Sequence, residues 1–240
     1  MKPQFKLFLI FSIVSFACLS DLNAQEKQEK IDFSAVDSLY REDQFYFGLN
    51  INLLNNLPEN VSQSGFAGGV IAGFIRDFPI NKRRNIGFGA GLGFSGNTYG
   101  HSLLLDRNEL GETVFIALED SEIEYNDNRF STYLVEMPLQ FRWRTSTATN
   151  SSFYRIYAGV VLGYMYHFRT NFRQDEGSIR ISNVPELNRF RTGLSLSIGS
   201  NFVNFHFQYT LNPMFDANIS GTNETFGIDK FKFGLIFYIL

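Results

Sequence analysis

The sequence contains very little cysteine and no hydrophobic run long enough for a membrane-spanning helix. Its single cysteine, Cys18, lies in the apolar run 7–19, so a chain that has lost this run has neither disulfides nor thiolate metal ligands. The run is shorter than the ~20 residues that a spanning helix needs. A lipoprotein signal would modify Cys18, but Ser15 stands where such a signal prefers an aliphatic residue. The net charge of −3 supplies no basic excess for phosphate backbones, so we expect no nucleic-acid partner.

The N-terminal region is typical of a secretory signal peptide. Two lysines precede the apolar run, and small residues follow it near position 24. We predict a signal peptide over residues 1–24, with cleavage between Ala24 and Gln25. A polar segment over residues 25–43 is then expected in the periplasm.

From residue 44 onward, apolar residues alternate with small or polar ones. The clearest example is 86–95, where large or aliphatic residues occupy every second position and glycine or serine lies between them. This period places all the apolar side chains of a β-strand on one face. When such strands form a closed sheet with the apolar face outward, the result is a membrane β-barrel. Averaging over the two faces also explains the low mean hydropathy of −0.10.

The alternation recurs eight times along the chain. The predicted strands are 44–53, 66–76, 86–95, 130–144, 153–169, 189–200, 203–211 and 229–240. Long connections follow the odd-numbered strands and short ones the even-numbered strands, as in barrels with extracellular loops and periplasmic turns. We therefore predict an all-β fold, an eight-stranded antiparallel up-and-down transmembrane β-barrel over residues 44–240, in the bacterial outer membrane.

Pro138 lies inside the fourth predicted strand. Proline cannot donate a hydrogen bond to a neighbouring strand, and within sheets it is confined to edges and bulges. We therefore expect a bulge or a local irregularity at residues 136–139.

The second face of the strands carries polar and charged residues that we expect inside the barrel. The candidate lumen network consists of Glu136, Gln140, Arg142, Arg155, Arg191, His206 and Gln208, and the same alternation places His167 and Arg169 on the inner face. Eight strands leave only enough interior space for side chains. The network therefore favours a plug of satisfied salt bridges over a conducting path.

Signals for catalysis, cofactors and metals are missing from the sequence. The histidines His101, His167 and His206 have no short ligand spacing, and no hydrolase, zinc-protease or nucleotide-binding fingerprint is present. His167 with Ser182 or Glu176 could be forced into a catalytic set, but their spacing gives no support. We predict a non-enzymatic protein without a cofactor.

Two segments could bind partners. The acidic connection 99–129 is either a surface that pairs with another protein or an extended, solvated hairpin above the membrane, and the sequence leaves both readings open. On the opposite side, segment 25–43 and the basic turn 82–84 could bind machinery in the periplasm.

The C-terminal residues resemble the signal read by the barrel-insertion machinery, which implies this machinery as a partner besides membrane lipid. The matching residues are Lys232, Gly234, Phe237 and Ile239, with Leu240 trailing. The barrel region as a whole resembles the OmpX-like and OmpA-like small outer-membrane barrels, and segment 136–139 is similar to an "E-x-P-L" strand common among them.

Three segments resemble the PorT family more narrowly: 74–82, 86–94 and 208–213. This resemblance implies an accessory role in the type IX secretion system, which exports adhesins and enzymes and supports gliding motility, with other secretion-system proteins as partners. Two alternatives remain: a surface-structural or adhesion barrel that uses its long loops, and a small-solute pore.

Overall fold

The computed structural model describes residues 43–119, 121, 123–145, 154–218 and 225–239. The predicted signal peptide, the cleavage site between Ala24 and Gln25, and all of segment 25–43 except its last residue lie outside this part of the chain. No helix that is both long and apolar enough to cross a membrane occurs in the described part.

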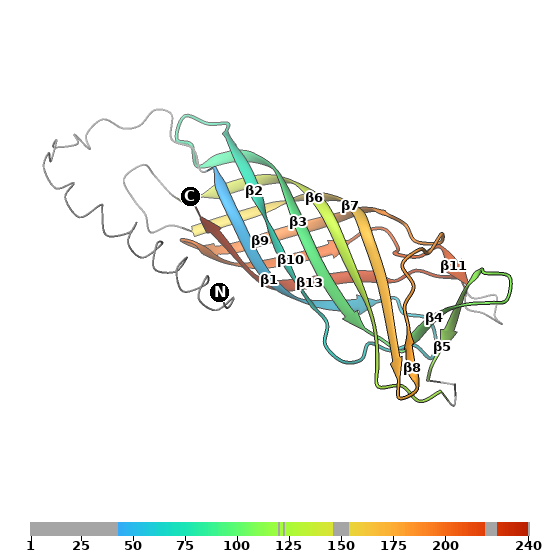
Figure 1. Ribbon diagram of the computed structural model, residues 1–240. Helices are drawn as coiled ribbons and strands as arrows, with labels where there is room; N and C mark the ends of the chain where they lie inside the picture. Colours follow the sequence, from blue (N-terminus) through green and yellow to red (C-terminus); the bar gives the residue numbers. More distant parts are fainter. Residues whose placement is uncertain (1–42, 120, 122, 146–153, 219–224, 240) are drawn as a thin grey trace, which may run out of the picture. The chain divides into compact units, whose positions relative to one another are not determined.

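Eight antiparallel strands form a closed barrel (Figure 1). Each pairs with the next along the chain, and the last pairs with the first, so that Phe45 lies opposite Ile239 and Leu53 opposite Phe231. Closure satisfies the backbone groups that would be exposed at an open edge in lipid. The predicted all-β, up-and-down fold is confirmed. The barrel strands are β1 (Gln44–Asn55), β2 (Gly68–Pro79), β3 (Ile86–Gly100), β6 (Asp127–Arg144), β7 (Tyr154–Gln174), β9 (Phe190–Ser200), β10 (Val203–Thr210) and β13 (Asp229–Ile239).

Short strands occur in the connections after β3, β7 and β10, and those labelled in Figure 1 lie at one end of the barrel. Within the predicted connection 99–129, β4 (Leu103–Arg107) and β5 (Thr113–Ala117) form a hairpin, so this connection is partly regular structure. Strand β8 (Gly177–Ile179) folds back onto β7, and β11 (Ala217–Asn218) pairs with β12 (Thr225–Phe226).

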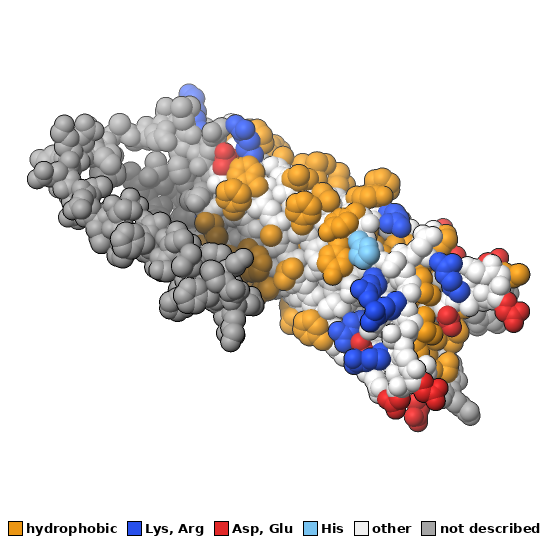
Figure 2. Space-filling model, viewed as in Figure 1, with side chains coloured by type: hydrophobic (Ala, Val, Ile, Leu, Met, Phe, Trp, Pro, Cys, Tyr) orange, Lys and Arg blue, Asp and Glu red, His pale blue; other side chains and the backbone are white. Residues whose placement is uncertain are grey.

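The predicted apolar faces point outward. Leu49, Leu92 and Phe205 are 51%, 58% and 63% exposed, and the apolar side chains spread over the barrel wall in Figure 2. In β2, where glycines obscured the alternation, Val70 and Phe74 face outward while Ile75 is buried. The barrel therefore presents an apolar surface to lipid, and this confirms the central expectation from the sequence.

The strand irregularity expected near Pro138 is present as a gap in pairing. Between β3 and β6, paired residues pass from Ala90 opposite Leu139 directly to Gly93 opposite Glu136, without a change of register. Pro138 still lies opposite Val161 on β7. The missing N–H of proline accounts for a local loss of pairing on one side.

The bulge itself lies further along the strand pair. Tyr133 is opposite His167, but Leu134 is opposite Met165, so Tyr166 is an extra residue in β7. The extra residue inverts the alternation beyond it, and Tyr166, His167 and Arg169 are all exposed. The prediction that His167 and Arg169 face the lumen is therefore wrong.

Candidate functional site

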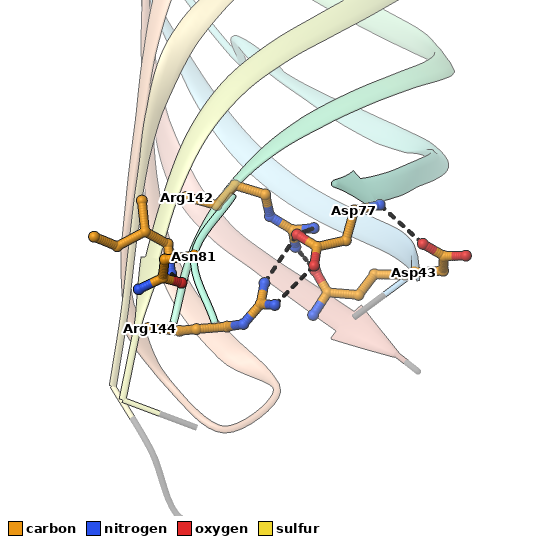
Figure 3. Close-up of polar contacts among 7 residues, drawn as sticks. Asp43, Asp77, Asn81, Arg142 and Arg144 are labelled. Carbon is orange, nitrogen blue, oxygen red and sulfur yellow. Dashed lines mark hydrogen bonds and ion pairs between the residues drawn. The ribbon is translucent and has the colours of Figure 1, made fainter. Parts of the chain in front are cut away.

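Asp77 on β2 holds two arginines of β6 at the periplasmic end of the lumen (Figure 3). Arg144 makes a bidentate contact, with Nη1–Oδ1 and Nη2–Oδ2 distances of 2.9 and 2.7 Å, and Arg142 Nη1 lies 3.0 Å from Oδ1. All three side chains are fully buried. The Asp77 backbone N–H donates to a carboxylate oxygen of Asp43 at 2.8 Å. This ion-pair cluster joins β2 to β6 across the intervening β3.

Aromatic rings fill the lumen beside the ion pairs. The guanidinium of Arg142 lies 4.2 Å from the ring centre of Tyr157 and also donates to the side-chain oxygen of Gln44. Arg155 lies 5.8 Å from the Tyr238 ring, and the two tyrosine rings pack edge to face at 5.4 Å. Such stacking suits the weakly hydrated, planar guanidinium group.

A second polar cluster surrounds Glu136 further along the lumen. Its Oε1 accepts a hydrogen bond from Ser95 at 2.9 Å and lies 3.7 Å from Lys232 Nζ. Arg191 donates to the backbone carbonyls of Pro213 and Asn212 at 2.6 and 2.8 Å. A cavity of about 20 Å³ lies among these side chains, which is room for about one water molecule.

All seven residues of the predicted lumen network are buried, but the contacts divide the network. Arg142 and Arg155 belong to the periplasmic end, while Glu136, Arg191 and Gln208 line the small cavity; Gln140 and His206 are also buried. Of the residues predicted as the insertion signal, Lys232 is buried in the lumen, Gly234 packs closely against β1, and Ile239 faces outward, as Phe237 does to a lesser extent.

The predicted lumen network did not include Asp77, Arg144 and Lys230, although the alternation along 130–144 predicts the same inner face for Arg144 as for Arg142. The predicted strand 66–76 ended one residue before Asp77, whereas β2 continues to Pro79. Continuing the two-residue period from Ile75 would have placed Asp77 inside the barrel. Lys230 is 3% exposed, and its ammonium lies 5.0 Å from the Tyr99 ring centre.

The extracellular end of the barrel is closed by a hydrophobic core that we call the cap core. Each of the four long connections contributes to it, with Val61, Phe115, Val184 and Met214 as examples. Phe130 of β6 lies among these residues, 4.8 Å from Tyr99 and 6.4 Å from Phe215 by ring centres. The cap core was not predicted from the sequence.

His101 lies beside the cap core and is 1% exposed. Its Nδ1 accepts a hydrogen bond from the Leu103 backbone N–H at 3.2 Å, and its ring packs 4.7 Å from Phe130. Burial lowers the pKa of His101 to about 3. Because the unfolded histidine takes up a proton near pH 6.5 and the folded one does not, acid destabilises the fold between pH 6.5 and 3.

These features define a closed, filled β-barrel of the bacterial outer membrane. Residues 23–216 match the family model of the outer membrane protein beta-barrel domain, and the chain belongs to this family. Among the described residues there is no group of three or more His, Cys, Asp or Glu side chains that could hold a metal ion.

Two solved structures are distant neighbours of this chain. Two crystal structures of Ail, the attachment invasion locus protein of Yersinia pestis, each align over 84% of this chain and 100% of their own. The complex with the heparin analogue sucrose octasulfate is 13% identical with a TM-score of 0.39; the other is 12% identical with a TM-score of 0.37. No curated protein matches the chain.

Proposed function

We propose that this protein is a non-enzymatic, non-conducting accessory of protein secretion across the outer membrane, in a type IX system of the PorT kind. The proposal rests first on the filled lumen. Among the described residues, the ion-pair cluster around Asp77 fills one end of the interior and the cap core closes the other, which favours a protein that acts through its surfaces.

The position of segment 74–82, which resembles the PorT family, supports the proposal. It forms the end of β2 and the start of the turn into β3, and Asp77 within it holds the β6 arginines. The turn itself carries the exposed side chains of Lys82 and Arg83. A turn fixed by a buried ion pair offers a rigid, basic docking face to secretion proteins in the periplasm.

A clean deletion strain tests this role. We expect type IX cargo to disappear from the culture medium of the deletion strain and to return when the wild-type gene is restored. Restoring Lys82→Glu/Arg83→Glu in place of the wild type is expected to leave barrel levels normal and cargo export reduced. Normal cargo export by the deletion strain would contradict the proposal.

A second candidate function is surface adhesion through the capped loops. The β4–β5 hairpin projects from the cap core, and Leu110 at its tip is 83% exposed. Replacing residues 108–112 with a short glycine and serine linker leaves the cap core intact. Loss of binding to host or matrix with unchanged cargo export would favour adhesion over secretion.

A further inference from the structure

We propose that the outer wall of β6 and β7 binds the phosphate groups of lipid A in the outer leaflet of the membrane. The site is an arginine patch made of Arg129, Arg169, Arg173 and Arg180, all exposed. Figure 2 shows basic side chains gathered next to a histidine, between the apolar wall and the acidic end of the molecule. This inference is independent of the role in secretion.

The patch begins where the lipid-facing surface ends. Outward apolar side chains run along β6 from Phe141 to Tyr133 and along β7 from Ile156 to Tyr166, about the 9–11 residues that a strand needs to cross a bilayer. Charged residues follow at once, with Arg169 opposite Ser131 and Arg173 opposite Asp127. The exposed rings of Tyr133 and Tyr166 mark the interface between hydrocarbon and headgroups.

The bulge at Tyr166 creates the patch. Without the extra residue, the alternation would turn Arg169 and Arg173 into the barrel and leave Phe168 and Phe172 outside. With it, the two phenylalanines are buried and the two arginines face outward. The inversion therefore places cationic groups on the outer wall at the level of the lipid headgroups.

The arginines of the patch carry more positive charge than the one carboxylate beside them neutralises, so the patch can bind an anion. A hollow of about 320 Å³ is lined by Arg129, Arg169 and Arg173, and Asp127 is the carboxylate beside it. Asp127 is engaged by Arg129 at 2.7 Å. Within the described part of the chain, the guanidinium groups of Arg169 and Arg173 make no hydrogen bond or ion pair.

Phosphate is the ligand chemistry that fits. The guanidinium fork donates two parallel hydrogen bonds to a phosphate, and arginine is the residue that proteins favour for this contact. The hollow is lined by Tyr133 of the membrane interface, and all of its lining residues belong to β6 and β7 rather than to the extracellular connections. Among outer-leaflet components, the glucosamine phosphates of lipid A lie at this height.

Titration of bis-phosphorylated lipid A into detergent-solubilised, full-length barrel tests the proposal, with native mass spectrometry as the readout. Arg169→Gln/Arg173→Gln is expected to weaken binding about thirtyfold, from the contribution of two arginines near an anionic surface. The control Arg76→Gln/Arg107→Gln removes the same charge from exposed sites outside the patch and is expected to change affinity less than threefold. Heat-modified gel mobility shows that each variant is folded.

Further arms separate phosphate recognition from general affinity. Lipid A stripped of both phosphates is expected to bind the wild type and Arg169→Gln/Arg173→Gln equally weakly. Arg169→Lys/Arg173→Lys keeps the charge but loses the bidentate geometry, and is expected to bind between the wild type and the glutamine variant. Equal binding of phosphorylated lipid A by the wild type and the glutamine variant would overturn the proposal, and so would a preference for a sulfated glycan over lipid A.

Discussion

Asp77→Asn tests whether the buried ion pairs at the periplasmic end hold the barrel together. The substitution keeps the shape of the side chain but removes the negative charge that faces Arg142 and Arg144. Both arginines are fully buried, so they lose the contacts with the Asp77 carboxylate without gaining access to water.

The expected cost follows from this burial. Removing one partner of a buried ion pair typically destabilises a protein by about 3–5 kcal/mol. Asp77 makes a bidentate contact with Arg144 and a further contact with Arg142. Because the asparagine can still accept a hydrogen bond from one arginine, we expect a loss near the lower end, about 3 kcal/mol.

The single tryptophan of the chain provides the assay. Trp143 lies on β6 between the two arginines, so its fluorescence reports on this end of the barrel during urea unfolding in lipid vesicles. Combining Asp77→Asn with Arg144→Gln should cost less than the sum of the two single changes, because both changes remove the same Asp77–Arg144 ion pair.

Asp216→Asn is the matched control, because this carboxylate is exposed. Its free energy of unfolding should stay within about 0.5 kcal/mol of the wild type. If Asp77→Asn behaves like Asp216→Asn, the ion-pair cluster does not stabilise the barrel and the reasoning fails.

Three further predictions concern other parts of the molecule. Going from pH 7 to pH 4.5, the protection of backbone amides near His101 against hydrogen exchange should fall in the wild type, and should fall less in His101→Phe. His167→Gln should behave as the wild type because His167 is exposed. Gly159→Ala should lower the free energy of unfolding by about 1–3 kcal/mol, since its methyl group would collide with the Leu139 carbonyl oxygen. Gly177→Ala meets open space and should leave the free energy of unfolding unchanged in a urea titration. Planar bilayers containing the folded barrel should show no steady conductance, and ohmic channels would contradict the filled lumen.

The barrel was predictable from the sequence because its governing physics is local. Each strand must turn one face to lipid, so the two-residue period alone assigned outward faces to residues as far apart as Leu49 and Phe205. The alternating connection lengths then fixed the order of loops and turns.

The bulge, the Asp77 ion pairs and the cap core depend on contacts between distant parts of the chain, which a two-residue period does not predict. One extra residue at Tyr166 leaves the row of outward tyrosines unbroken, so the inversion that turns Arg169 outward carries no signal in the sequence alone. Asp77 was missed because an aspartate next to an arginine in the sequence is typical of a turn. Its partners, Arg142 and Arg144, lie on β6, far away along the chain. The cap core combines residues of four separate connections with residues near the ends of barrel strands, and no single period along the chain links them.

The composition of the cap core has a consequence for biogenesis. Its side chains come from every one of the four extracellular connections, from Val61 in the first to Ile228 at the end of the last. None of these segments completes the core without the others, so the core closes only after all four have been translocated. We therefore expect the closure of the cap core at the extracellular end to be a late step in folding.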